Sequence, residues 1–234
     1  MKERPIPFNA DMVRAVLDGR KTQTRRILKP QPVEHDGYWS WSSGYMGKDD
    51  RHPLFGLHFA DASLPQCRRM LSSVPSPYGK PGDRLWVRET LRIIERGTRG
   101  VAGDHLLKYE ATHVPVQIAD TAEKRAWVDA RLVSHIERAH DPLGNASFRV
   151  PSIHMPRWAS RILLEVTDVR VERVQEISIF DVIEEGVSLP NYATQPEMRC
   201  AFRDLWKSIN GPDAWGRNDW VWVVEFKRVD GVLS

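Results

Sequence analysis

The chain has 234 residues, of which 41 % are hydrophobic and 28 % charged, and its net charge is only +3. This composition excludes an intrinsically disordered chain, and the small net charge excludes a protein that holds nucleic acid through its overall charge. No apolar run reaches the roughly 18–20 residues of a membrane span, and the N-terminus lacks the apolar core of a signal peptide. With only two distant cysteines, Cys67 and Cys200, the sequence predicts a cytoplasmic protein without a membrane partner.

The N-terminal segment predicts a helix followed by a basic run. Asn9 can cap a helix over residues 10–18, and Gly19 is a natural helix stop. The run GRKTQTRR then has four cations in eight residues. It is a solvated basic loop, a phosphate-contacting strip or the floor of a pocket. Lys21 and Thr24 would point to opposite faces of a regular strand, so a shared pocket requires a turn or bulge after Gly19.

The next segment, residues 29–82, is rich in glycine, proline and serine and is expected to be irregular. KPGD predicts a turn that leads into a strand with the sequence DRLWVRETL. If Leu85 and Val87 face the core, Trp86 and Arg88 point the other way, where a nucleobase could stack on the indole. The alternative is that Trp86 packs under a helix.

Residues 92–150 have a mixed pattern, in which AEKRAWVDARLVSHIERA is helix-like. The following stretch, PSIHMPRWASRI, brings His154, Arg157 and Trp158 just before a strand. These three side chains are candidates for the rim of a binding pocket. A lone histidine is more often structural, so His154 has the weakest case.

The C-terminal part predicts a strand, two helices and a closing strand. Residues 161–174 are rich in β-branched side chains and form one long bent strand or two short ones. SIFDVIEEG is a helix capped by Ser178 and ended by Gly186, and PEMRCAFRDLWKSING is a second helix with apolar residues at i, i+3, i+4 and i+7. The strand WVWVVEFKRV is expected to be buried on both faces. Together these elements predict an α+β fold, a mixed β-barrel decorated with short helices.

Four stretches in this order resemble the ASCH domain, a member of the PUA-like β-barrel superfamily. They are GRKTQTRR, KPGDRLWVRE, EVTDVRVERVQEISIFDVIEEGV and FRDLWKSINGPDAWGRNDWVWVVEFKRV. The closest similarity is to the larger bacterial and prophage ASCH proteins. The family signature G-x-K-x-x-[TE]-x-R is matched here by Gly19, Lys21, Thr24 and Arg26. The similarity implies a single domain over 1–234, with a core at about 4–32, 79–91 and 150–229 and insertions at about 33–78 and 92–149.

The resemblance also implies a site. Some small ASCH proteins hydrolyse N4-acetylcytidine to cytidine and acetate with a lysine, a threonine and a distant glutamate, whereas others are assigned RNA binding or nuclease activity. Lys21 and Thr24 match that lysine and threonine. Counting from the E-V-T strand places the glutamate at Glu185, with Glu184 as the alternative. The expected substrate-binding residues are Gly19, Arg20, Arg26, Trp86, Arg88, His154, Arg157 and Trp158.

The chemistry of an N4-acyl amide can be assigned to these side chains. Hydrolysis requires an attacking oxygen, a base, a stabilised oxyanion and an acid for the departing amine. Lys21 would stabilise the oxyanion or act as the base, Thr24 would attack or position a water, and Glu185 would pass a proton to the leaving nitrogen. Glu185 could equally be a plain helix end, and Arg26 could pair with a carboxylate to hold the barrel.

Three functions are therefore compared. The first is an amidohydrolase acting on N4-acylated cytidine or a related modified pyrimidine nucleoside. The second is a non-catalytic module that binds RNA or modified nucleic acid. A ribonuclease ranks third, because the sequence offers no evident carboxylate cluster for a metal. With no glycine-rich phosphate loop and no metal-ligand spacing among the histidines, we expect neither a cofactor nor a metal.

Overall fold

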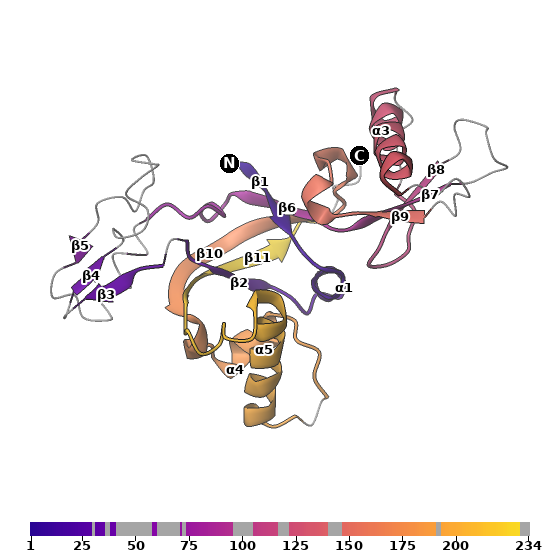
Figure 1. The fold of residues 1–234 in the computed structure, drawn as a ribbon. Helices are drawn as coiled ribbons and strands as arrows, with labels where there is room; N and C mark the ends of the chain where they lie inside the picture. Colours follow the sequence, from indigo (N-terminus) through magenta and orange to yellow (C-terminus); the bar gives the residue numbers. More distant parts are fainter. Residues whose placement is uncertain are drawn as a thin grey trace. The chain divides into compact units, whose positions relative to one another are not determined.

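The computed structural model (Figure 1) describes ten stretches of the chain. The chain divides into two compact units. The first unit consists of Met1–Arg4, Asp18–Leu85 and Leu164–Val229, and the second mainly of Pro5–Leu17 and Trp86–Leu163. The described residues are 1–29, 31–35, 38–40, 58–59, 71, 74–95, 105–116, 122–139, 147–190 and 193–229.

The described elements form three sheets and a few helices, which confirms the α+β class. The sheets have the strand orders β1-β6-β10-β11-β2, β3-β4-β5 and β8-β7-β9, and within the described residues they do not close into a barrel. The strands are β1 (Glu3–Pro7), β2 (Gln23–Ile27), β3 (Val33–His35), β4 (Tyr38–Ser40), β5 (His58–Phe59), β6 (Arg84–Arg88), β7 (Leu91–Glu95), β8 (His105–Tyr109), β9 (Ser147–Val150), β10 (Leu163–Arg173) and β11 (Trp220–Arg228). The helices are α1 (Ala10–Leu17), α3 (Ala122–Ala139), α4 (Ile179–Glu184) and α5 (Gln195–Asn210), with 3-10 turns at Ser152–His154, Arg157–Ala159 and Val174–Glu176.

The helix ends follow the capping residues seen in the sequence. The Asn9 side chain accepts a hydrogen bond from the backbone of the first turn of α1, and Ser178 and Asp181 form a reciprocal capping box at the start of α4. Gly19 and Gly186 lie just beyond α1 and α4 with φ of +73° and +76°, a conformation that glycine adopts without strain. The predicted helices before Gly19 and Gly186 are therefore confirmed, as are the helices at α3 and α5.

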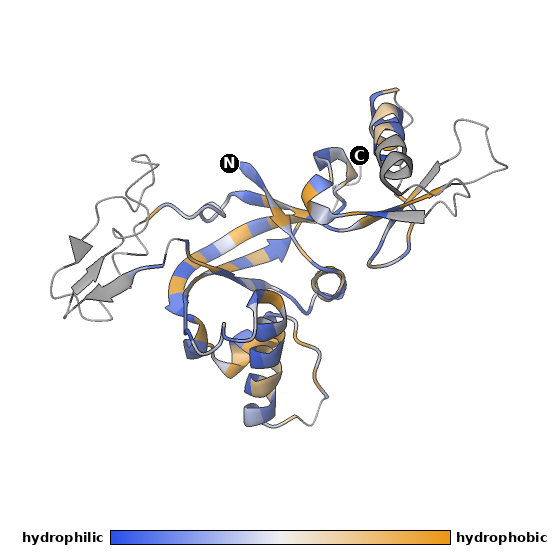
Figure 2. Ribbon diagram, viewed as in Figure 1, coloured by the Kyte–Doolittle hydropathy of each residue, from blue (hydrophilic) through white to orange (hydrophobic). Residues whose placement is uncertain are grey.

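In the first unit, the antiparallel strands β10 and β11 carry the core. β10 is one long strand whose register shifts between Val166 and Asp168, which confirms the bent strand expected here. Figure 2 shows apolar and polar residues alternating along it. β11 is buried on both faces, as expected, and its Val221 and Val223 pack against the apolar sides of α4 and α5. This packing fixes α4, and with it the residues at its C-terminal end, against the sheet.

In the second unit, β7 lies between β8 and β9, and their buried residues form a separate core. This core includes Leu91, Ile93, Leu107, Tyr109 and Val150. The irregular segment expected over 29–82 is only partly irregular, because β3, β4 and β5 pair within it. Strands of two or three residues are too short for an alternating pattern to reveal them. No helix in the described stretches has both the length and the apolar composition needed to cross a membrane.

Candidate functional site

The structure brings Lys21 and Glu185 together in a buried ion pair of the first unit. Lys21 lies between the turn at Gly19 and the start of β2, and it forms an isolated β-bridge with Glu185, which caps α4. The Nζ of Lys21 donates to Oε2 and to the backbone carbonyl of Glu185, each at 2.8 Å. Only 1 % of the Lys21 side chain and 6 % of the Glu185 side chain is exposed. Both groups are thus held in one geometry and shielded from bulk water.

Opposing electrostatic effects act on the pKa of Lys21. Burial lowers its pKa below the ordinary lysine value, while the charge and hydrogen bond of Glu185 act in the other direction. The positive charges of Arg26 and Arg25 lower the pKa further. A lysine in this setting gives up its proton more easily than a surface lysine, and it stays cationic mainly through its partner carboxylate.

Arg25 contacts the other oxygen of the same carboxylate, although it was not among the expected site residues. Its Nη1 lies 3.4 Å from Oε1 of Glu185, and its Nη2 lies 3.1 Å from Glu172 and 3.2 Å from Asp181. The Arg25 side chain is fully buried, and its Nε has no hydrogen-bond partner among the described residues. Glu185 is therefore fixed between two cations, one on each carboxylate oxygen.

A second arginine extends this charge network toward the surface. Arg170 binds Glu172 at 2.7 Å and Asp181 at 3.1 Å, and it also pairs with Glu225. Burial acts to lower the pKa of Arg170, but the hydrogen bonds and charges of Glu172 and Glu225 outweigh it and raise the pKa. Burial acts to raise the pKa of Asp181, but the hydrogen bonds to this carboxylate and the charge of Arg25 outweigh the burial effect and lower the pKa. We expect the network to hold Arg25, and through it Glu185, in place.

Glu184, the alternative carboxylate, lies in a different environment. It is exposed, and its side chain accepts a hydrogen bond from Gln23 at 3.3 Å. Burial of its carboxyl group and repulsion from Glu225 and Asp181 raise its pKa. Of the two neighbours, Glu185 is the one that the structure pairs with Lys21.

Thr24 and Arg26 lie on the face of β2 opposite to the one that carries Arg25. Thr24 is paired with Val224 and Arg26 with Trp222 across the β2–β11 ladder, whereas Arg25 is paired with Val223 on the side of α4 and α5. Thr24 is buried, with 1 % exposed. The irregular backbone after Gly19 places Lys21 outside the regular alternation of β2.

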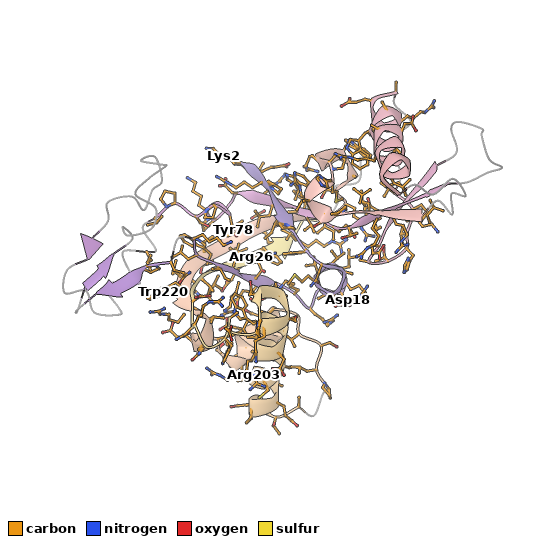
Figure 3. All side chains as sticks on the ribbon, viewed as in Figure 1. Lys2, Asp18, Arg26, Tyr78, Arg203 and Trp220 are labelled. Atoms are coloured by element: carbon orange, nitrogen blue, oxygen red, sulfur yellow. The ribbon has the colours of Figure 1, made fainter. Side chains whose placement is uncertain are left out.

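A cavity of about 590 Å³ opens on the side of Arg26. Its described lining residues are Arg26, Ile27, Leu28, Lys29, Val74, Pro75, Pro77, Tyr78, Asn210 and Trp222, so the three expected catalytic residues do not line it. Arg26 lines this cavity and also acts electrostatically on Lys21. Burial lowers the pKa of Arg26, although the negative charge of Glu185 acts against this, and the positive charge of Arg26 lowers the pKa of Lys21. Figure 3 labels Arg26 and Tyr78 next to each other, in agreement with this cavity.

No protein-family model, no curated protein and no solved structure matches the chain. Within the ranges that the structure describes, no group of three or more His, Cys, Asp and Glu side chains could hold a metal ion.

The remaining residues of the basic run, Gly19 and Arg20, lie at the turn between α1 and Lys21. The positive φ of Gly19 turns the chain before Lys21, and a Cβ at this position would have no atom within 4 Å. Arg20 is exposed and donates to the carbonyl of Gly186 at 3.2 Å and to Asp18 at 3.0 Å. Arg20 thus ties the basic run to the glycine that ends α4.

The other expected binding residues lie in the second unit. Trp86 is only 8 % exposed, and the guanidinium groups of Arg88 and Arg157 lie 4.7 Å and 5.9 Å from the centre of its indole. The ring therefore offers little surface on which a nucleobase could stack. His154 is exposed on a 3-10 turn, and Trp158 packs edge-on against Trp127 with ring centres 5.6 Å apart.

Proposed function

We propose that this chain is an amidohydrolase that removes the acyl group from N4-acylated cytidine or a related modified pyrimidine nucleoside. The observation that supports it most is the buried contact between Lys21 Nζ and Glu185 Oε2 at 2.8 Å, between residues 164 positions apart. The order of motifs that resembles ASCH proteins supports a PUA-like relationship. The same resemblance implies that Lys21 and Glu185 are reacting groups, and these two side chains form an ion pair in the first unit.

The reaction adds one water to the acyl carbon and breaks the bond from that carbon to N4. The products are the free 4-amino pyrimidine and a carboxylic acid. In the proposed site, the Lys21 ammonium stabilises the oxyanion that forms on the acyl oxygen. Glu185 accepts a proton from the attacking water and delivers it to N4 as the amine leaves. No other group has to be consumed, so the proton and the atoms of water are accounted for.

The contacts of Glu185 suit a proton relay. One carboxylate oxygen accepts from Lys21 and the other faces Arg25 at 3.4 Å, so the orientation of the carboxylate is fixed. Thr24 lies on the face of β2 that carries Arg26, and the resemblance assigns it the attack or the positioning of the water; an acyl group formed on Thr24 would be released by water. Arg26 extends the positive potential from the Lys21 pair to the cavity.

Turnover of N4-acetylcytidine by the purified protein tests the proposal, with cytidine and acetate separated by mass. Glu185→Gln, which is nearly isosteric, should lose at least about 100-fold in kcat, within the range of general acid–base contributions. The matched control is Glu184→Gln, which changes the neighbouring exposed carboxylate and should keep wild-type turnover. Equal activity of the two variants would contradict the role of Glu185. A folded wild-type protein that binds the nucleoside without turning it over would indicate a binding module instead.

A further inference from the structure

Both terminal nitrogens of Arg25 face acceptors within the protein. Nη1 lies 3.4 Å from Oε1 of Glu185 and also donates to the side-chain oxygen of Gln23. Nη2 lies 3.1 Å from Glu172 and 3.2 Å from Asp181, and none of the Arg25 side chain is exposed. Because the protein itself takes both nitrogens, this arginine is suited to hold another side chain rather than to bind a ligand.

The acceptors other than Glu185 come from three elements, and together they fix the guanidinium of Arg25. Gln23 belongs to β2 itself, Glu172 to β10 and Asp181 to the first turn of α4. Gln23 is completely buried and is held in turn, because its amide nitrogen donates to Asp181 at 3.0 Å. The planar fork of an arginine meets several such acceptors at once, whereas a lysine ammonium is a point charge on a flexible stem.

The fixed guanidinium determines how the carboxylate of Glu185 is turned. Arg25 faces Oε1, while Lys21 donates to Oε2 at 2.8 Å. Both oxygens belong to one planar group, so a rotation that carried Oε1 away from Arg25 would also carry Oε2 away from Lys21. The neighbouring Glu184 accepts from Gln23 at 3.3 Å instead. Gln23 and Arg25, two positions apart on one face of β2, therefore hold the two adjacent glutamates separately.

We propose that Arg25 is a positioning residue, which turns the Glu185 carboxylate so that one oxygen faces Lys21 and the group can exchange a proton with the substrate. This deepens the proposed function and rests on it, because Glu185 is the proton relay of that reaction. Arg25 itself does not touch the reacting atoms. Loss of its guanidinium should therefore slow the chemical step, which kcat reports, and leave KM nearly unchanged.

Turnover of N4-acetylcytidine by Arg25→Lys tests this role, because the variant keeps the charge and loses the fork. We expect kcat per folded molecule to fall at least about tenfold with KM within about twofold of the wild type, since a small displacement of a reacting group is costly. The matched control is Arg161→Lys, which changes an arginine of the second unit that binds the buried Glu89 at 2.8 Å and 2.9 Å and should keep wild-type kcat. Equal kcat in the two variants, or a raised KM with unchanged kcat in Arg25→Lys, would overturn the positioning role.

Glu172→Gln serves as a second variant that leaves Arg25 itself in place. The Glu172 side chain is 18 % exposed, so the fold can accommodate this nearly isosteric change, which weakens the anchor of Nη2. We expect kcat to fall at least about twofold with an unchanged KM. If Arg25→Lys failed to fold, an unchanged kcat in Glu172→Gln would overturn the role.

A double-mutant cycle on stability separates this inference from the amidohydrolase. Urea unfolding of the wild type, Arg25→Lys, Glu185→Gln and the double variant measures the coupling of the two side chains without a substrate. Arg25→Lys should change the unfolding equilibrium constant at least about fivefold less in the Glu185→Gln background than in the wild type. Additive effects would overturn the inference even if the wild type hydrolyses N4-acetylcytidine. Coupled effects in a folded protein without turnover would contradict the amidohydrolase and support Arg25 as the group that orients Glu185.

Discussion

Removal of one partner of the Lys21–Glu185 pair has a predictable effect on stability. In Glu185→Ala, the Lys21 ammonium stays in a site where only 1 % of its side chain is exposed. Loss of one partner of a buried ion pair costs about 3–5 kcal/mol. For a chain of this length each kcal/mol lowers Tm by about 2–4 °C, so we expect Tm to fall by about 6–20 °C. Urea unfolding followed by tryptophan fluorescence gives the free energy of unfolding directly.

The control is Glu184→Ala, which removes the adjacent carboxylate. Glu184 is exposed, and its pKa is raised in part by repulsion from Glu225 and Asp181. Its removal should change the free energy of unfolding by no more than roughly 0.5 kcal/mol. If Glu185→Ala destabilised the protein no more than Glu184→Ala does, the buried ion pair would not contribute to the stability of the fold.

Two further predictions concern pH and the turn before β6. Because burial lowers the native pKa of Lys21 below 10.5, the unfolded chain binds that proton more tightly. The free energy of unfolding should therefore rise with pH from the native pKa of Lys21 up to about 10.5. Urea midpoints measured across this range should show the rise in the wild type and in the control Lys227→Met, which changes an exposed lysine. The rise should be smaller in Lys21→Met. In Gly79→Ala, the new Cβ would lie 2.9 Å from the Asp83 carboxylate at φ of +97°, whereas Gly82→Ala meets no atom within 4 Å at φ of +87°. Thermal unfolding should show a larger loss for Gly79→Ala, beyond the roughly 1–3 kcal/mol of backbone strain that both share, and equal losses would refute the clash.

Local sequence signals predicted the elements that frame the site. Asn9, Ser178 and Gly186 mark helix ends through capping and backbone conformation, which act over a few residues. The closing strand is recognisable as buried on both faces because its apolar residues continue without alternation. Such signals need no knowledge of the tertiary structure.

The contacts of the site depend on residues far apart in the chain, and local pattern does not contain them. Arg25 and Arg26 look alike in the sequence, yet adjacent positions of a strand face opposite ways, so one meets carboxylates and the other a cavity. Recognition of β2 as a strand would have revealed this difference. Tyr78 escapes prediction because it lies in a stretch that the resemblance assigns to an insertion, and Trp222 because its surroundings in the sequence indicate only a core residue.

One measurement addresses the central claim most directly. The purified wild-type protein is incubated with N4-acetylcytidine in ¹⁸O-labelled water, and the products are identified by mass. The proposed hydrolysis predicts cytidine together with acetate that carries one solvent oxygen, whether water attacks directly or releases an acyl group from Thr24. Unchanged N4-acetylcytidine in the presence of folded protein would contradict the assignment of Lys21 and Glu185 to the hydrolysis of this substrate.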